Sequence, residues 1–371
     1  MPHSIERILS QHIPYERRNT MKAQLLSKIG KMEYTQMPDP VAGEDEVIVA
    51  VKAAGVCGSD IARAFKDGAH KMPIIIGHEF AGEVADTGRR VGVFPLIPCR
   101  KCPSCLKKQY EMCANYNYLG SRCNGGFAQY VAVPKWNLID LPDNVSFEEA
   151  AMLEPMAVAV HAMRRAYVKE SDTVVVCGLG TIGLLLTMFL IEKGVKNLLV
   201  IGNKEFQKKT ALELGIAEEN YCNSKEGSVS DFIKDRTNGA GADVFYECVG
   251  NNTTVSLAIE NAARGGKVCF VGNPHSDMTL DKPVYWGILR KQLTITGTWN
   301  SSYLGEDGNE DQDECPYEAD DWKYCISKLA EGKINPAKLI THKFPLETIV
   351  TGMEIMRDKS EDYIKVMAIM D

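Results

Sequence analysis

Four cysteines lie close together in the sequence, in the arrangement Cys99-x2-Cys102-x2-Cys105-x7-Cys113. Four thiolates at short spacing in one loop can close a tetrahedral zinc site. A four-iron cluster is the main alternative, but the last spacing and the lack of a proline after the fourth cysteine fit it poorly. Disulfide bonds are a further alternative and would require an oxidising compartment. We therefore expect a structural zinc ion in this loop.

A second chemical signal is the run Gly178-Leu179-Gly180-Thr181-Ile182-Gly183, which has the pattern G-x-G-x-x-G. It joins a short β-branched stretch, 172–177, to an apolar helical stretch, 184–192. The first glycine permits a tight turn, the second lets the backbone approach a pyrophosphate, and the third lets helix and strand pack closely. The pattern alone is weak, but its place between a strand and a helix favours a dinucleotide site over a plain glycine-rich turn.

Other residues that can bind a metal are dispersed: Cys57, the neighbours His78 and Glu79, and Glu154. A thiolate, an imidazole and a carboxylate can hold a zinc ion and leave one position open for a substrate. Their spacing does not identify such a site. Taken singly, Cys57 is better explained as a buried thiol and His78 as a hydrogen-bonded core histidine.

The strands and helices that must position these residues follow a different sequence pattern in different parts of the chain. Residues 21–168 consist of short strands and turns, as in an irregular β domain. Residues 169–305 alternate strands and helices, which predicts a six-stranded, doubly wound parallel sheet and an α/β fold. We expect residues 306–371 to return to the first domain, so that the nucleotide domain is inserted in it. Residues 1–20 show no clear period and are either a leader or an arm on the surface.

Length and composition exclude several classes of protein. A chain of 371 residues is too long for one typical core, so two domains are expected. The net charge of −7 does not indicate binding to nucleic acid or to an anionic membrane surface, since both would require a positively charged protein surface. There is no apolar run of transmembrane length and no visible secretory signal. Twelve cysteines without such a signal suggest reduced thiols or metal ligands, and so a cytoplasmic protein.

Together these features resemble the medium-chain, zinc-dependent alcohol and polyol dehydrogenases. The resemblance runs from about Met21 to the C-terminus and rests on motifs in the family's order: GVCGSD, GHEF, the four-cysteine lobe, GGFAQY, LEPMAVAVHA and GLGTIG. It implies a GroES-like, mostly-β catalytic domain and a Rossmann domain, with the active site in the cleft between them. It also implies one catalytic and one structural zinc ion per chain, an NAD(P) cofactor, and a homodimer or homotetramer.

The resemblance also implies roles for single residues. Cys57, His78 and Glu154 are the first-choice ligands of the catalytic zinc, and Glu79 can replace water or Glu154. Ser59 matches the family hydroxyl that relays a proton, and is otherwise a turn residue. The substrate hydroxyl would bind the open position, where the zinc lowers its pKa, and hydride would pass to the nicotinamide.

The predicted second strand of the nucleotide domain ends in Gly202, Asn203 and Lys204. This position normally carries an acidic residue that binds the ribose 2′-hydroxyl of NAD. Without that carboxylate, a 2′-phosphate is not repelled, and Lys204 and Asn203 supply a positive charge and a donor. The same arrangement is found in NADP-using relatives, so we expect NADP to be favoured over NAD.

Several segments look most like family members that act on sugar-alcohol phosphates: CGSDIARAFKDGAH, PLIPCRKCPSC, YLGSRCNGGFAQY and ILRKQLTITGTW. This likeness implies oxidation of a secondary hydroxyl of a phosphorylated polyol. Arg63, Lys66 and Arg122 are the candidates to bind the phosphate, and are otherwise solvated surface charges.

Other functions remain open at this point. The enzyme could instead oxidise an unphosphorylated polyol or sugar, or reduce a ketose phosphate. A third hypothesis, a non-catalytic nucleotide-binding protein on the same fold, is disfavoured by the intact set of metal-binding residues and Ser59, because such a protein would not need an open metal site.

Overall fold

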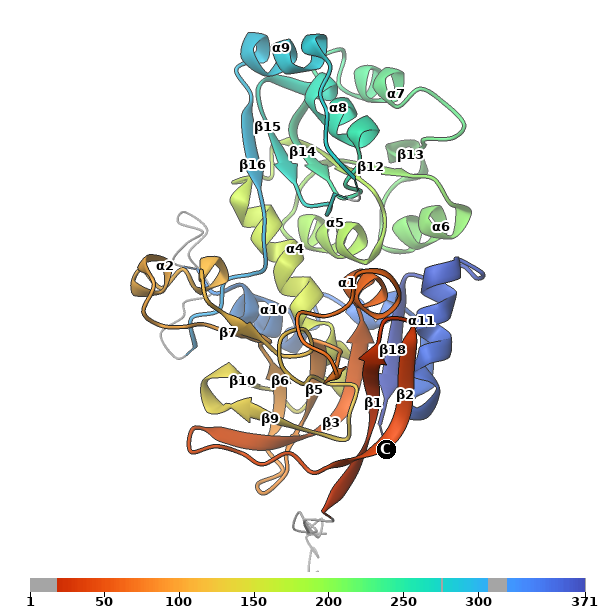
Figure 1. Ribbon diagram of the computed structural model, residues 1–371. Helices are drawn as coiled ribbons and strands as arrows, with labels where there is room; N and C mark the ends of the chain where they lie inside the picture. Colours follow the sequence, from red (N-terminus) through yellow and green to blue (C-terminus); the bar gives the residue numbers. More distant parts are fainter. Residues whose placement is uncertain (1–18, 275, 306–318, 371) are drawn as a thin grey trace, which may run out of the picture.

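The computed structural model describes residues 19–274, 276–305 and 319–370. The chain forms two units, which lie one above the other in Figure 1. The predicted leader or arm at 1–20 lies almost entirely outside the described residues, as does most of the acidic stretch that follows Gly305.

The upper unit contains a six-stranded parallel sheet with the order β13-β12-β11-β14-β15-β16. This is the order of a Rossmann fold, with the first strand at the point where the direction of winding reverses. The strands are β11 (Thr173–Cys177), β12 (Asn197–Gly202), β13 (Tyr221–Asn223), β14 (Ala242–Glu247), β15 (Ala262–Phe270) and β16 (Thr294–Gly297). The predicted doubly wound sheet is confirmed.

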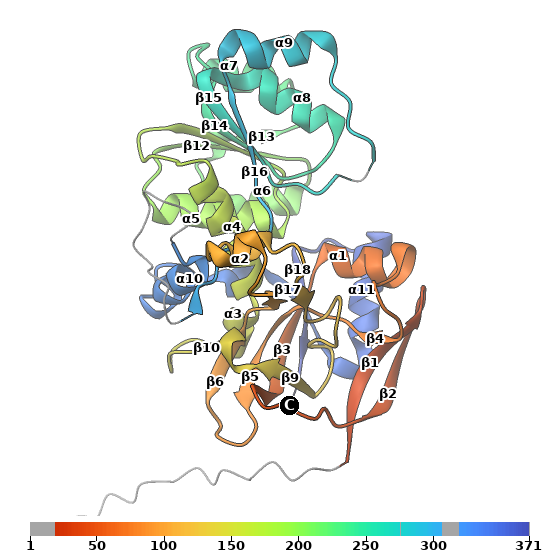
Figure 2. The ribbon, with the colours of Figure 1, turned by 60° about the vertical axis from the view of Figure 1, so that its left-hand side comes forward.

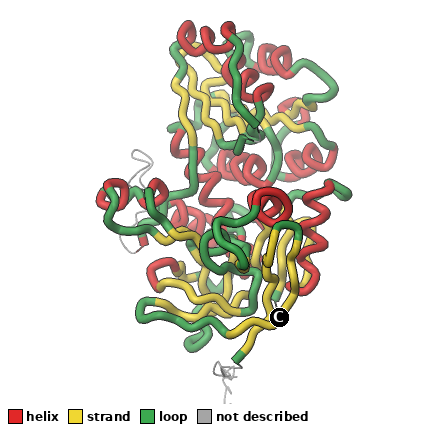
Figure 3. Tube along the Cα trace, in the orientation of Figure 1, coloured by secondary structure: helices red, strands yellow, loops and turns green. Residues whose placement is uncertain are grey.

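Helices cover both faces of this sheet, as Figure 3 shows by colour. They are α5 (Thr181–Glu192), α6 (Glu205–Glu213), α7 (Val229–Arg236), α8 (Asn252–Asn261) and α9 (Lys282–Lys291). Coverage on both faces explains why β11 is apolar throughout rather than alternating: Val174, Val175 and Val176 are all fully buried. Similarly, α5 is buried along most of its length because it lies between this sheet and the rest of the chain.

The lower unit is built on a mixed sheet with the order β10-β6-β5-β3-β18-β17, and β9 pairs with β3 at its other end. Two smaller sheets, β2-β1-β4 and β7-β8, flank it. The strands before the nucleotide unit are β1 (Thr20–Lys28), β2 (Lys31–Pro38), β3 (Glu46–Val56), β4 (Ile74–Ile75), β5 (Glu79–Val84), β6 (Arg90–Val93), β7 (Leu96–Ile97), β8 (Asn117–Tyr118), β9 (Tyr130–Pro134) and β10 (Leu138–Asp140).

The chain returns to this sheet after the nucleotide unit. β17 (Ile340–Pro345) and β18 (Lys365–Ile369) pair in parallel, and β18 lies beside β3. The returning segment also supplies α10 (Asp321–Ala330) and α11 (Ile349–Asp358), drawn in blue in the lower half of Figure 1. The described part of the tail therefore lies with the strands that precede the nucleotide unit, as an insertion requires.

Short helices complete the lower unit: α1 (Gly58–Ala62) with a π-helical turn (Arg63–Asp67), α2 (Pro103–Leu106) and α3 (Phe147–Ala151). Isolated 3-10 turns lie at Tyr110–Met112, Lys135–Asn137, Glu218–Asn220, Pro336–Leu339 and Leu346–Thr348. Among the described helices, none has the length and hydrophobicity that crossing a membrane requires. The cytoplasmic location stays a prediction.

Helix α4 (Leu153–Arg165) joins the two units. It lies between them in Figures 1 and 2, and it packs against both α5 and α10. One hydrophobic cluster accordingly contains residues of both units, such as Phe94 and Ile139 from the lower and Val174 and Leu184 from the upper. The shared core fixes the position of one unit relative to the other.

Candidate active site and cysteine lobe

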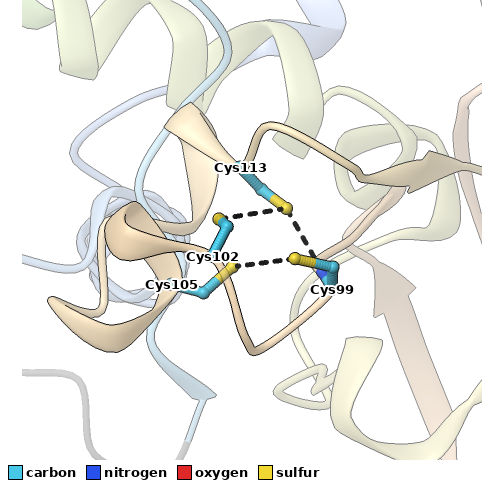
Figure 4. A group of neighbouring side chains, drawn as sticks. All are labelled: Cys99, Cys102, Cys105 and Cys113. Atoms are coloured by element: carbon cyan, nitrogen blue, oxygen red, sulfur yellow. Dashed lines mark hydrogen bonds between the residues drawn. The ribbon is translucent and has the colours of Figure 1, made fainter.

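The four cysteines of the lobe converge, as Figure 4 shows. Their sulfur atoms all lie within 4.8 Å of one another. Cys99 Sγ lies 3.9 Å from Cys105 Sγ, and Cys102 Sγ lies 3.9 Å from Cys113 Sγ. Zinc–sulfur bonds of about 2.3 Å in a tetrahedron place two sulfur atoms about 3.8 Å apart. The four thiols therefore fit a tetrahedral zinc ion, and none of the described cysteines forms a disulfide.

The surroundings of the lobe already favour a thiolate at one ligand. Backbone amides of Cys105 and Ala114 donate to Cys102 and lower the pKa of its thiol to about 6. Burial and neighbouring thiols instead raise the pKa of Cys105 to about 12. The lobe thus presents a negative charge to a cation, and the thiols that are still protonated would lose their protons when all four sulfur atoms bind it.

Cys57, His78 and Glu79 come close together because the paired strands β3 and β5 lie side by side. Cys57 follows the end of β3, and His78 and Glu79 stand at the start of the antiparallel strand β5, where Gly55 is paired with Glu79. One ligand atom from each of Cys57, His78 and Glu79 lies within 4.8 Å of the other two. Glu154, from the first turn of α4, is not part of this group but lines the same cavity.

His78 is oriented by a carboxylate behind it. Asp60 is fully buried, and its Oδ1 lies 3.3 Å from His78 Nδ1 and 2.9 Å from Arg63 Nη1. A carboxylate at Nδ1 leaves Nε2 as the nitrogen that can bind a metal. Burial lowers the pKa of His78, but Asp60 and Cys57 raise it well above its ordinary value. The site therefore attracts positive charge, as a cation site must.

Two further contacts place the glutamates. Lys365, the first residue of β18, forms a buried ion pair with Glu79. The Tyr118 hydroxyl donates a hydrogen bond of 3.1 Å to Glu154. Removal from water, with help from Glu79, raises the pKa of the Glu154 carboxyl to about 7, although His78, Lys365 and Tyr118 act to lower it.

A cavity of about 290 Å³ opens above these residues and reaches both units. Its walls include Ser59 and Tyr118 from the lower unit, and Ile182, Val271 and Asn273 from the upper. A cleft bounded by a polar metal-binding floor and by the turn after β11 is where a substrate and a dinucleotide can meet.

The glycines of the turn after β11 each have a structural reason. Gly178 has φ +101°, and a Cβ atom on it would lie 2.6 Å from Val249 Cγ2. Gly183 lies against the carbonyl of Gly178, which lets α5 approach the strand. Gly180 has open space around its Cα, so a pyrophosphate can approach the backbone there. Beside it, the Thr181 hydroxyl donates to the Ile364 carbonyl at 2.7 Å and so ties this turn to the returning segment.

The end of β12 is shaped by a residue that the sequence did not point to. A Cβ atom on Gly202 would lie 2.9 Å from the hydroxyl oxygen of Tyr221, in β13. That buried hydroxyl has no hydrogen-bond partner among the described residues. Asn203 is exposed beside it, and Lys204 Nζ lies over the rings of Phe206 and Tyr363, at 5.1 and 5.9 Å.

The three candidates for binding a substrate phosphate have different positions. Arg63 lines the cavity, but its guanidinium also binds Asp60. Arg122 lies 4.3 Å over the ring of Tyr116, which lines the cavity. Lys66 is exposed and is not among the residues of the cavity wall. His70, which the sequence did not single out, does line the wall.

Three of the residues that the sequence missed act through another residue. Asp60 contacts His78, Tyr118 contacts Glu154, and Lys365 contacts Glu79. A carboxylate three residues after Cys57 was a usable signal for Asp60, because it follows the cysteine within one helical turn. No local pattern marked Lys365.

Comparison with known proteins agrees with this geometry. Residues 43–143 match the model of the alcohol dehydrogenase GroES-like domain, and residues 181–313 match that of zinc-binding dehydrogenases. The chain is 34% identical to galactitol 1-phosphate 5-dehydrogenase of Escherichia coli K12 over 319 residues, which cover 84% of this chain and 88% of that protein. The chain belongs to the zinc-dependent medium-chain alcohol and polyol dehydrogenases. As a member of that family it is an oxidoreductase that uses zinc and a nicotinamide cofactor.

Solved structures and other relatives show how broad this dehydrogenase family is. The crystal structure of galactitol-1-phosphate dehydrogenase from Escherichia coli superposes with a TM-score of 0.85 at 31% identity, covering 94% of this chain and all of that chain. Sorbitol dehydrogenase of Bacillus subtilis is 28% identical over 94% of this chain and 96% of its own length. An alcohol dehydrogenase of Escherichia coli CFT073, solved with NADH, superposes with a TM-score of 0.83 at 25% identity. The match covers 95% of this chain and all of that chain.

Proposed function

We propose that this dehydrogenase transfers hydride between NADP and a secondary hydroxyl of a sugar-alcohol phosphate. The observation that supports this most is the single cavity that joins Cys57, His78, Glu79 and Ser59 to the nucleotide unit. The 34% identity to a dehydrogenase of a polyol phosphate favours that substrate class.

Different residues of the cavity would have different roles in such a reaction. When bound, zinc supplies a Lewis acid for the substrate oxygen, and the nicotinamide supplies the hydride acceptor. Cys57, His78 and a glutamate would hold the ion, and Asp60 fixes the ring of His78. Ser59 lines the cavity and relays the proton that the substrate hydroxyl loses, giving its own hydroxyl proton toward solvent as it accepts that proton; its hydroxyl lies 3.5 Å from Arg63 Nη1.

A second zinc ion is proposed in the cysteine lobe, held by Cys99, Cys102, Cys105 and Cys113. Metal analysis of the purified protein tests both sites together. Two zinc ions per chain are expected. One ion per chain, lost without effect on the fold, would contradict the lobe assignment; one ion per chain with no activity on any polyol would contradict the enzyme.

The choice of NADP rests on the end of β12. Any side chain at Gly202 would contact the Tyr221 hydroxyl, so an acidic residue cannot stand there unless Tyr221 moves. Tyr221 and Lys204 instead offer a donor and a positive charge to a 2′-phosphate. We expect Lys204→Ala to weaken NADPH binding about tenfold or more and to leave NADH binding nearly unchanged. Lys209→Ala, an exposed lysine of the same helix, is the matched control. A strong preference of the unaltered protein for NADH would overturn this choice.

The phosphate part of the proposal can be tested separately. Arg122→Ala is expected to raise KM for the phosphorylated polyol by about one to two orders of magnitude, because it removes a charge-assisted pair. Arg63 is left in place in this test, because it also binds Asp60, which contacts His78. KM for the same polyol without phosphate should hardly change. Lys66→Ala is the control, since Lys66 is exposed and lies outside the cavity wall.

One observation favours a second candidate, an unphosphorylated polyol. Arg63 is already engaged by Asp60 and Arg122 is stacked on Tyr116, so neither guanidinium is wholly available to a phosphate. A screen of phosphorylated and free polyols with both cofactors decides between the two. If the free polyol is the better substrate, the phosphate is abandoned and the polyol dehydrogenase is kept.

We also propose that the protein forms a homodimer or homotetramer. Among the described strands, β16 pairs only with β15, so its other edge is unpaired. Exposed apolar side chains lie on and beside it: Tyr285, Trp286, Leu289 and Ile295. An unpaired edge next to an apolar patch is suited to a second copy. Light scattering should show a monomer for Leu289→Asp but not for Leu106→Asp, an exposed leucine of the cysteine lobe.

A further inference from the structure

A second cavity lies in the nucleotide unit, apart from the candidate active site. It has a volume of about 370 Å³ and is bounded by the parallel sheet and by the helices α8 and α9, which pack against each other at the top of Figure 2. Its walls include Val255 and Ile259 of α8, Phe270 of β15, Ile288 of α9 and Ile295 of β16. A volume of this size is within the range of pockets that bind small molecules.

The cavity is apolar and open to solvent on one side. Met278, Leu280 and Ile295, which all line it, are exposed, whereas Val255 and Ile259 are buried. The buried side chains belong to a hydrophobic cluster that is separate from the main cores of the two units. A ligand with an apolar body can therefore enter from the surface, and it would remove apolar surface from water when it does so.

One buried carboxylate also lines this cavity. Glu247, the last residue of β14, is fully buried. Its Oε1 accepts three hydrogen bonds, from the amides of Val249 and Gly250 at 2.8 and 2.9 Å and from the Thr254 hydroxyl at 2.8 Å. Its Oε2 has no hydrogen-bond partner among the described residues. A buried carboxylate oxygen without a donor is costly, so this oxygen is suited to a donor that arrives with a ligand.

The cavity shares a wall with the candidate active site but is distinct from it. In the segment that follows β15, Val271 and Asn273 line the active-site cavity. Gly272 and Pro274, which alternate with them, line the apolar cavity instead. The two cavities therefore lie on opposite sides of one segment, and a ligand in one need not displace a ligand from the other.

We propose that this cavity is a second ligand-binding site, for an apolar molecule that carries one primary ammonium group. The ammonium donates to Glu247 Oε2, and the apolar body packs against α8, α9 and β15. A cationic head is favoured over a hydroxyl, because hydrogen bonds between charged groups are stronger than those between neutral ones. A carboxylate head is repelled by Glu247. The inference depends neither on the zinc sites nor on the cofactor of the proposed function.

The test uses three probes of equal chain length: octylamine, 1-octanol and octanoate. Their binding to the full-length protein is measured by isothermal titration calorimetry with saturating NADPH or NADH, so that the nucleotide cleft is occupied. Octylamine is expected to bind at least about tenfold more tightly than 1-octanol, and octanoate to bind most weakly. Equal affinities for octylamine and 1-octanol, or no binding of octylamine, would overturn the proposal.

Glu247→Gln tests the carboxylate itself. Its amide oxygen can still accept from the three donors, but an NH2 group then replaces the free oxygen at the cavity. Octylamine should bind at least about tenfold more weakly than to the unaltered protein, and octanoate should bind more tightly, because the cavity now offers a donor. An unchanged order of the three probes would show that Glu247 does not select the ligand.

Ile288→Trp tests the place of binding. The larger ring fills the cavity between α8 and α9, so the binding of all three probes should be lost. Ile191→Trp, the same change at an exposed position of α5 outside the cavity wall, is the matched control and should bind them normally. If Ile288→Trp does not fold, the order of the probes in the unaltered and Glu247→Gln proteins still decides.

Two further results would contradict the proposal. Octylamine binding that survives Ile288→Trp would mean that the probe binds elsewhere, such as in the active-site cavity. Binding to the Leu289→Asp monomer but not to the unaltered protein would mean that a second copy of the chain already covers the cavity, since Ile295 belongs both to its wall and to the apolar patch beside β16.

Discussion

The cysteine lobe and the Cys57–His78–Glu79 site differ in how the chain builds them. The lobe takes all four ligands from one loop, residues 99–113, with only a short helix and a 3-10 turn inside it. The other site takes its residues from the ends of two strands and depends on α4 and β18 for Glu154 and Lys365. A contiguous loop can surround an ion completely, whereas side chains fixed on a rigid sheet can leave one direction free.

The charges around the two sites differ in the same way. In the lobe, backbone amides lower the pKa of the Cys102 thiol to about 6, and burial raises that of the Cys105 thiol to about 12. Around the other site each carboxylate has a partner of its own: Arg63 for Asp60, Tyr118 for Glu154 and Lys365 for Glu79. The first arrangement suits retention of an ion, and the second suits control of its reactivity.

The largest difference between the two sites is expected in activity. Cys57→Ser should lower kcat about a thousandfold, because a Lewis acid contributes several kcal/mol to the transition state. The thermal midpoint should stay within about 1 °C of that of the unaltered protein, since this ion does not hold the fold together. Steady-state kinetics and calorimetry on the same preparation measure both. Activity that survives the change would remove Cys57 from the metal shell.

The second effect concerns stability and belongs to the lobe. Cys102→Ser should release one zinc ion and cost about 3 kcal/mol, which lowers the thermal midpoint by about 4 °C if all 371 residues unfold together. Cys123→Ser, at a half-buried cysteine outside the lobe, is the control and should keep both ions. If Cys57→Ser and Cys102→Ser destabilised the protein equally, the distinction between the two sites would be wrong.

A third, smaller effect follows from Glu154 in the metal-free protein. Burial raises its folded pKa to about 7, above the unfolded value of about 4.3, so the folded state binds the extra proton between these values. The free energy of unfolding should therefore fall as the pH rises from about 5 to 7, by about 2 kcal/mol in all. Denaturant unfolding of chelator-treated protein measures this slope, and Glu154→Gln should lack it. An equal slope in both proteins would show that another group is responsible.

The smallest expected effect tests the partner of that glutamate. Tyr118→Phe removes the 3.1 Å hydrogen bond to Glu154 and should lower kcat/KM about fivefold, equivalent to about 1 kcal/mol. Zinc content should not change, because Tyr118 is not a ligand. Loss of metal in this variant would mean that Tyr118 holds the site together rather than tuning it.

The two sites also differ in how far the sequence could predict them. The lobe could be found from spacing alone, because Cys99, Cys102, Cys105 and Cys113 are neighbours in one loop. The parallel sheet was equally accessible, since each strand and its helix form a local pattern. Six strands were expected, but no pattern located one of them, β13, which is only three residues long and too short to show a period.

The dispersed site required the resemblance to a family, because nothing local connects Cys57 with His78. The residues that contact its candidate ligands could not be predicted either, because they too lie far away in the sequence. Lys365 pairs with Glu79 across 286 positions, and only the pairing of β18 with β3 brings them together. Lys66 illustrates the opposite failure: its nearness to Cys57 in sequence suggested the pocket, but the turn after α1 leaves it exposed outside the cavity wall.

The position of β18 in the mixed sheet, between β3 and the edge strand β17, has a consequence for biosynthesis. Ribosomes make β3 before the nucleotide unit and β18 after it, so the lower sheet cannot be completed beyond β3 until β18 and β17 have been synthesised. At synthesis rates of about 5–20 residues per second, this delay is on the order of tens of seconds. During that time the part of β3 that pairs with β18, Ala53–Val56, has no partner on one edge, although β9 already covers Glu46–Ala50. The nucleotide unit, which is continuous in the chain, can already fold. Newly made chains are therefore most exposed to aggregation at β3, and they acquire a complete active site only after β18 has emerged.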